Sequence, residues 1–86
     1  MALICVHGPL RKLAGGESRH PVDGETVGAL LQALEHEQPA LAGWILDERI
    51  RIRRHINVYV NGKLGDEDTA VADGDRVEVL PAISGG

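Results

Sequence analysis

The sequence predicts a two-layer α+β domain in which a mixed sheet packs on one main helix. Apolar residues alternate near both ends of the chain, an amphipathic helical pattern lies between them, and the hairpin signal Asn61-Gly62 follows a third alternating run. A chain of 86 residues is long enough for one domain with a modest core. That core has to be aliphatic, because phenylalanine is absent and Trp44 and Tyr59 are the only aromatic residues.

The N-terminal segment is expected to form a strand, and the segment that follows it could pair with that strand. Residues 2–7 alternate, so that Ile4 and Val6 share one face and the other face carries Leu3, Cys5 and His7. Gly8-Pro9 breaks this strand, and residues 17–22 are weakly strand-like.

The clearest helix begins after Thr26, which is a suitable N-cap. Apolar residues follow at i, i+3, i+4 and i+7, namely Val27, Leu30, Leu31 and Leu34. Pro39 ends this helix and can start a short turn, in which Trp44 is expected to be a packed anchor.

The C-terminal half is expected to add three strands. Residues 55–60 form the strongest strand, Asn61-Gly62 turns the chain, and residues 63–64 begin the return. Asp73-Gly74 marks another turn before a last strand over residues 76–80. If the helical segment crosses over between the hairpins, the first and last strands lie centrally and parallel, which is a β-grasp (ubiquitin-like) arrangement.

The last strand predicts a docking surface. Val77 and Val79 share a parity and are expected to face the helix, whereas Leu80 falls on the uncovered face. Neighbouring strands place further residues on that face: Tyr59, Leu3 and His7. A face covered by a loop, or an ordinary mixed surface, is the alternative. Pro81 is expected to prevent normal ladder pairing and to release the tail.

The sequence ends in Ile83-Ser84-Gly85-Gly86. Two consecutive glycines form a thin segment that can follow a narrow channel in another protein, although chain ends are also often frayed. We therefore expect a domain over residues 1–82 and a flexible diglycine tail over residues 83–86.

Composition excludes several classes of function. A net charge of −4 argues against a nucleic-acid partner. A local basic cluster, comprising Arg49, Arg51, Arg53, Arg54 and His55, is either a solvated loop or a docking patch for an acidic partner. One cysteine and four scattered histidines give no disulfide and no metal-ligand spacing. The first apolar stretch is too short for a membrane span, so we expect a cytoplasmic protein without a membrane partner.

The residues nevertheless resemble a known family. The stretch over 71–86, with its turn, strand, proline and terminal Gly-Gly in register, resembles the ending of the small ubiquitin-like sulfur carriers of the MoaD/ThiS family. Residues 56–61 and the helix opening at Thr26-Val27 are similar to that family too. Residues 80–83 and the strand over 57–61 look most like those of the cysteine-biosynthesis carriers (CysO), and carriers that supply sulfur to secondary metabolites would look much the same. The molybdopterin type often has aromatic residues before the proline, where this chain has Val79 and Leu80.

The resemblance implies a carrier rather than an enzyme. A partner using ATP would adenylate the Gly86 carboxylate, and sulfur transfer would then give a 1-thioglycine thiocarboxylate. The thiocarboxylate would donate sulfur in the biosynthesis of cysteine or a related metabolite, through a cysteine-synthase-like or other acceptor synthase. We expect no cofactor or metal bound to the chain itself. The expected partner-binding residues are Gly85, Ser84, Ile83, Pro81, Leu80, Tyr59 and His7.

Three alternatives stay open from the sequence. The chain could be a molybdopterin synthase small subunit, or a protein modifier that forms isopeptide bonds to lysines. It could also be an interaction-only β-grasp module in which Gly-Gly is incidental.

Overall fold

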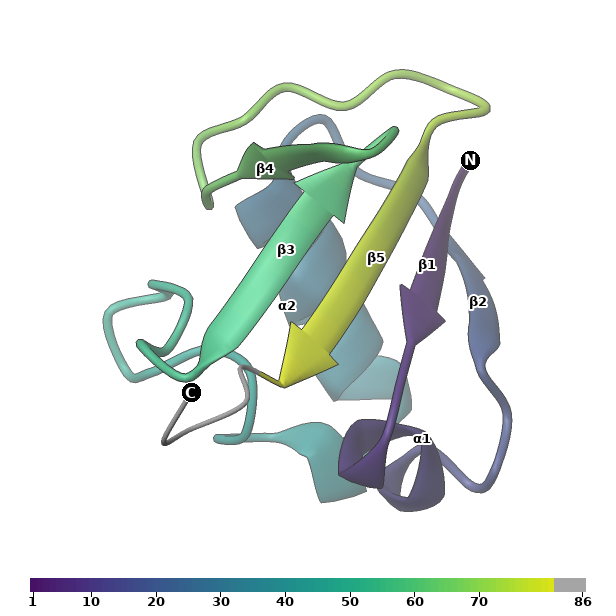
Figure 1. Ribbon diagram of the computed structural model, residues 1–86, viewed down its shortest axis with the longest axis vertical. Helices are drawn as coiled ribbons and strands as arrows, with labels where there is room; N and C mark the ends of the chain where they lie inside the picture. Colours follow the sequence, from purple (N-terminus) through teal and green to yellow (C-terminus); the bar gives the residue numbers. More distant parts are fainter. Residues whose placement is uncertain (82–86) are drawn as a thin grey trace.

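The computed structural model describes residues 1–81. Its elements, in chain order, are β1 (Ala2–Val6), α1 (Pro9–Leu13), β2 (Arg19–Val22), α2 (Val27–Glu37), the 3-10 helix η1 (Pro39–Leu41), β3 (Ile56–Val60), β4 (Lys63–Gly65) and β5 (Arg76–Pro81). Within residues 1–81 the strands form one five-stranded sheet in the order β2-β1-β5-β3-β4. The helix α2 crosses one face of this sheet (Figure 1).

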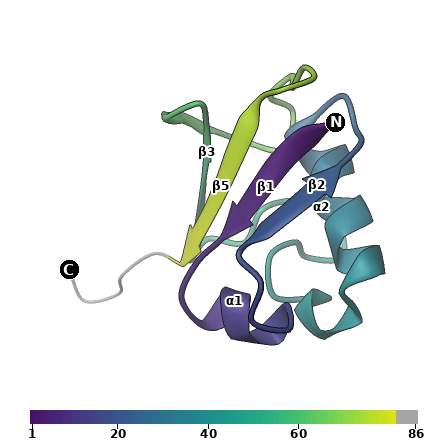
Figure 2. The same cartoon turned by 90° about the vertical axis from the view of Figure 1, so that its right-hand side faces the viewer.

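The central pair of the sheet confirms the β-grasp arrangement. β1 and β5 run parallel, with Ile4 opposite Val77 and Val6 opposite Val79. β2 pairs antiparallel with β1, and β3 pairs antiparallel with both β4 and β5. Figure 2 shows the two layers edge-on, with α2 to the right of the sheet and the other sheet face left open.

The main helix begins where its capping residue predicts. The Thr26 hydroxyl oxygen accepts a hydrogen bond from the Ala29 amide at 3.2 Å, which satisfies one of the free donors of the first turn. The helix ends at Glu37, before Pro39 begins η1. Its buried stripe faces the sheet and consists of Val27, Gly28, Leu30, Leu31 and Leu34.

The core between these layers is aliphatic, as expected. Its largest fully buried side chains are Ile4, Leu30, Leu31, Leu34, Leu41, Ile45, Val6, Val27, Val58, Val77 and Val79. Removing such a side chain from water contributes about 1.5–3 kcal/mol, so these residues dominate the stability of the domain. Leu10 from α1 also belongs to this core.

Two local features differ from the expectation. The segment after Gly8 does more than break the strand: Pro9–Leu13 forms α1, because Leu10, Leu13 and Ala14 have helical spacing against the core. The prediction that Trp44 is a packed anchor was wrong, since its side chain is 50% exposed. Leu41, Ile45 and Leu46 take the core positions around it, which leaves the indole on the surface.

The helices of the described chain are short. None of those within residues 1–81 is long and apolar enough to cross a bilayer.

Candidate partner-binding site

The strand β5 presents two different faces, as its parity predicts. Val77 and Val79 are fully buried in the core. Arg76, Glu78 and Leu80 point to the other face, where Arg76 is exposed and Glu78 and Leu80 are half-buried. The open face therefore carries a mixture of charge and apolar surface beside the end of the strand.

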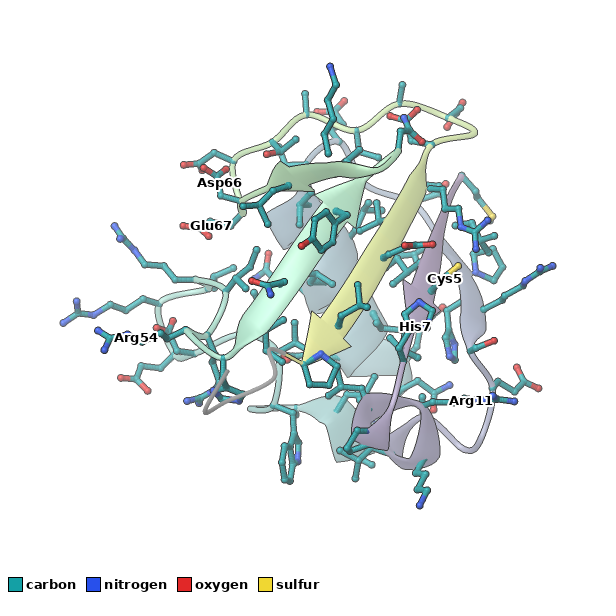
Figure 3. All side chains as sticks on the ribbon, in the orientation of Figure 1. Cys5, His7, Arg11, Arg54, Asp66 and Glu67 are labelled. Atoms are coloured by element: carbon teal, nitrogen blue, oxygen red, sulfur yellow. The ribbon has the colours of Figure 1, made fainter. Side chains whose placement is uncertain are left out.

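Three of the predicted contact residues lie together on this open face. Leu80 lies opposite Asn57 of β3, and Tyr59 lies opposite Glu78 two pairs along, so Leu80 and Tyr59 are diagonal neighbours on one face. On the other side of β5, the His7 amide donates a hydrogen bond to the Val79 carbonyl at 3.2 Å. The sheet thus brings His7, Leu80 and Tyr59 to one surface, visible in Figure 3 with His7 beside the end of β5.

Pro81 requires a correction. We expected it to prevent ladder pairing, but Pro81 is the last residue of β5 and lies in register with Ile56 of β3. The missing amide is tolerated because the pairing with β1 ends at Val6 opposite Val79, two residues before Pro81. Pro81 therefore extends the sheet by one residue and sets the point where β5 ends.

The loop after β1 packs against this point. Gly8 adopts a positive φ of 61°, and a β-carbon added there would lie 3.6 Å from Pro81 Cγ. The positive φ favours glycine because an L side chain is strained in this conformation. Gly8 thus brings the start of α1 beside the end of β5.

Ionic and thiol groups on the open face are held within the sheet. Arg76 Nε lies 3.2 Å from Glu78 Oε1, which joins two side chains that share the face. Cys5 lies between Arg19 of β2 and Glu78 of β5 in the register and is only 2% exposed. The Cys5 thiol is therefore shielded from solvent although it lies on the open face.

The arginine-rich loop before β3 is ordered around one carboxylate. Asp47 Oδ1 accepts hydrogen bonds from the amides of Arg49 at 2.8 Å and Arg51 at 3.0 Å. These bonds, the one from Arg51 first, lower the pKa of Asp47. The loop leads directly into Ile56, the register partner of Pro81, so the basic cluster lies at the same end of the sheet as Pro81.

Two buried nitrogens at this end have no hydrogen-bond acceptor within the described chain. They are His7 Nε2, beside the end of β5, and Arg53 Nε, in the basic loop.

Four of the predicted site residues come after residue 81, the last residue that the structure describes. Ile83, Ser84, Gly85 and Gly86 lie outside the described residues. Residues 1–81 contain no group of three or more His, Cys, Asp or Glu side chains arranged to hold a metal ion. The described part of the predicted site is a surface next to the end of β5.

Sequence reasoning missed part of this surface. It did not identify Gly8, Arg11 or Lys12 as neighbours of the end of β5. The signal was present in the pattern of Leu10, Leu13 and Ala14, which has helical spacing and follows a proline suited to a first helical position.

Comparison with known proteins supports a specific relationship. The model of the ThiS family matches residues 4–86. The sulfur carrier protein CysO of Mycobacterium tuberculosis is 36% identical over 87 residues, which covers 90% of this chain and 89% of CysO. Small archaeal modifier protein 3 of Haloferax volcanii is 40% identical over 68 residues, covering 74% of this chain and 73% of the modifier.

Solved structures agree with the sequence comparison. A chain in the crystal structure of the Amycolatopsis orientalis BexX/CysO complex matches with a TM-score of 0.88 at 30% identity, covering 100% of both chains. Both sulfur carriers and small protein modifiers are therefore among the relatives of this chain.

Proposed function

This chain belongs to the ThiS family of sulfur carriers and ubiquitin-like small modifiers, and we propose that it is a sulfur carrier. In this proposal Gly86, the last residue of the sequence, is the reactive residue. A partner enzyme adenylates the Gly86 carboxylate with ATP, and sulfur then replaces one carboxylate oxygen.

One arrangement carries the proposal. β5 ends at Pro81 on the rim of the sheet, next to Gly8, and five residues follow, the last two of which are Gly85-Gly86. The likeness to CysO, which is named a sulfur carrier, supports the same interpretation. A short glycine-terminated segment beside an open contact surface suits delivery of a carboxylate into a partner's active site.

The chemistry accounts for the need for ATP. A carboxylate is a poor electrophile, because its negative charge repels nucleophiles. Its oxygen attacks the α-phosphorus of ATP, pyrophosphate leaves, and an acyl-adenylate forms. A hydrosulfide ion then adds to the carbonyl carbon and expels AMP, which leaves a thiocarboxylate and one proton. Water would hydrolyse the acyl-adenylate, so the reaction requires a closed pocket in the partner.

The proposed sulfur acceptor is based on the same relatives. We propose that the thiocarboxylate supplies sulfur to a synthase for cysteine or a related sulfur metabolite, because the family members that match over most of the chain include CysO proteins. A thiocarboxylate sulfur is a soft nucleophile and can attack an activated carbon in such a synthase.

A protein modifier is the second candidate. Its support is the 40% identity with small archaeal modifier protein 3. The same acyl-adenylate could be attacked by a lysine amine, which would give an isopeptide bond instead of a thiocarboxylate. The two candidates therefore differ in the product at Gly86 rather than in the activation step.

The test is reconstitution with the adenylating enzyme encoded in the same genome, ATP and sulfide. Intact-mass spectrometry should show an increase of about 16 Da, the difference between sulfur and oxygen in the terminal group. The Gly86 deletion variant serves as the control and should keep its mass. An unchanged wild-type mass, while an established carrier reacts with its own enzyme alongside, would contradict the proposal.

A further inference from the structure

Lys and Arg residues are concentrated at one end of the sheet, and carboxylates predominate at the other. At one end lie the connections 23–26, 61–62 and 66–75, whose charged side chains in the described chain are all carboxylates: Asp23, Glu25, Asp66, Glu67, Asp68, Asp73 and Asp75. At the other end lie the connections 7–18 and 42–55, which carry six of the nine Lys and Arg residues together with three carboxylates, Glu17, Asp47 and Glu48. We call these residues the basic end: Arg11, Lys12, Arg49, Arg51, Arg53 and Arg54.

The basic end surrounds the point where β5 ends. Arg11 belongs to α1, which follows the Gly8 contact with Pro81, and Arg54 lies in the loop that leads into Ile56. Figure 3 shows Arg54 to the left and Arg11 to the right of the lower end of β5, with Asp66 higher in the view. Cations therefore flank the end of β5 on both sides.

The cations of the basic end are available for a partner. The ion pairs within residues 1–81 involve only the N-terminal amine and Arg76, neither of which belongs to the basic end. Two carboxylates near the arginines bond to backbone amides of the loop: Asp47 accepts from Arg49 and Arg51, and Glu67 Oε2 accepts from Ile52 at 3.4 Å. Five of the six cations are exposed, with Arg53 half-buried.

The surface at the basic end is also hollowed beside α1. Gly8, Pro9, Arg11, Lys12 and Gly16 line an open hollow of about 620 Å³. Trp44 is half exposed, and Ile45 next to it accepts a hydrogen bond from the Arg53 amide at 2.9 Å. Tryptophan and arginine are enriched where proteins bind one another, so this end resembles an interface more than an ordinary solvated loop.

Geometry restricts which surface the adenylating partner can contact. Five residues follow Pro81, and a fully extended chain spans at most about 3.6 Å per residue, or about 18 Å in total. An enzyme that holds the Gly86 carboxylate in its active site must therefore approach the domain within that distance of Pro81. The basic end lies at that position.

We propose that the basic end docks on an acidic protein surface that surrounds the tail-binding channel of the adenylating enzyme. This inference rests on the proposed function. The chain carries a net charge of −4, so an acidic partner would repel it on average. The cations of the basic end reverse this repulsion locally. They orient the end of β5 toward the partner, which raises the rate of productive encounter.

Charge reversal at single exposed residues tests the proposal. Arg54→Glu and Lys12→Glu change the basic end, and Lys63→Glu makes the same change in charge at the opposite end, at the start of β4. Each variant takes the net charge from −4 to −6 (−4 − 2). Pyrophosphate release by the adenylating enzyme should show kcat/KM about tenfold lower for Arg54→Glu and Lys12→Glu, with kcat unchanged. Lys63→Glu should remain within about twofold of wild type.

The dependence of kcat/KM on ionic strength provides an independent test of the docking proposal. Raising salt from about 0.05 to 0.5 M should lower the wild-type kcat/KM and abolish the difference between the variants, because screening shortens the range of the charges. Equal kcat/KM for all variants, or no salt dependence, would overturn the docking proposal while leaving adenylation intact. Absence of pyrophosphate release from wild type would instead refute the proposed function.

A probe that needs no enzyme separates the two claims completely. A hexaglutamate peptide titrated into the isotope-labelled full chain should shift the amide signals of Arg11, Lys12 and Arg54, and leave those of Lys63 in place. Arg54→Glu should weaken these shifts at least severalfold. Shifts spread evenly over the surface, or none at all, would show that the basic end does not recognise acidic polypeptide.

Discussion

Val79 and Leu80 are consecutive residues of β5 that lie on opposite faces of the sheet. Val79 is fully buried opposite Val58, whereas Leu80 is half-buried opposite Asn57 on the open face. One residue of β5 thus contributes to folding and the next to the surface beside the end of the strand. This separation allows stability and partner binding to be changed independently.

The first prediction uses that separation. Val79→Asp places a carboxylate in the aliphatic core without a partner and should destabilise the domain by more than about 3 kcal/mol. Leu80→Asp places the same charge on the open face and should change the free energy of unfolding by less than about 1 kcal/mol. Chemical denaturation followed by circular dichroism measures both values.

Partner activation completes this comparison. Leu80→Asp should remain folded and yet lower kcat/KM for pyrophosphate release, because Leu80, Tyr59 and His7 share one surface. If Leu80→Asp unfolded the domain and Val79→Asp did not, the assignment of the two faces would be wrong by one residue.

The second prediction concerns the helix cap. Thr26→Ala removes the oxygen that accepts from the Ala29 amide and should cost about 1 kcal/mol of stability. Thr26→Ser keeps the oxygen and should retain most of that stability. Thermal unfolding of the three proteins measures the effect, and equal midpoints for Ala and wild type would show that the cap contributes nothing.

The third prediction is a pH dependence. Asp75 accepts hydrogen bonds from the Ala72 amide at 2.9 Å and from the Asn61 side chain at 3.0 Å, and these bonds lower its pKa. A carboxyl whose pKa is lower in the folded state binds fewer protons there than in the unfolded chain. Its contribution to stability is present above the unfolded value of about 3.9 and is lost as the pH falls through the folded pKa.

Removal of the Asp75 charge should therefore flatten the acid branch of the stability curve. Asp75→Asn should be less stable than wild type at pH 7 and lose less stability as the pH falls below about 4. Asn61→Gly keeps the positive φ of 51° at that turn but removes both the donor to Asp75 and the oxygen that accepts from the Arg76 amide. It should lower stability at pH 7 and leave part of the acid dependence in place. Parallel curves for wild type and Asp75→Asn would contradict this account.

Much of the fold could be predicted because local signals agreed with the global pattern. Thr26 marks the start of α2, Asn61-Gly62 forms the turn between β3 and β4, and the parity of β5 matches its burial. These features depend on periodicity and turn chemistry, which are properties of short segments.

Other features depend on tertiary contacts that short segments do not encode. The pairing of Pro81 with Ile56 depends on where β1 stops along β5, and the exposure of Trp44 depends on its neighbours filling the core. The approach of Gly8 to Pro81 joins residues far apart in the sequence. The expected contact residues on the open face could be named from parity. The position of the basic end beside them could not be, because it depends on how the connections are arranged in space.

The fourth prediction concerns the last two residues. Gly85→Val should leave the free energy of unfolding within about 0.5 kcal/mol of wild type, because we expect residue 85 to belong to a tail outside the core. Activation should fall strongly, since a β-branched side chain stiffens and widens a segment that has to enter a channel. Deleting Gly86 should be as damaging, because the carboxylate loses about 3.3–3.6 Å of reach. Pyrophosphate release at the wild-type rate from both variants would show that activation does not depend on the Gly-Gly ending, which would contradict the proposed role of Gly86.

The most direct test is the chemical state of Gly86 in the protein isolated from its own cells. Top-down mass spectrometry should find a C-terminal fragment containing Ser84, Gly85 and Gly86 that is about 16 Da heavier than the sequence requires, with the change confined to Gly86. Treatment with an alkylating reagent should label that terminal sulfur, while Cys5, which is buried in the folded domain, provides the internal comparison. A Gly86 found only as an ordinary carboxylate, or only in an isopeptide bond to lysine, would contradict the sulfur-carrier account.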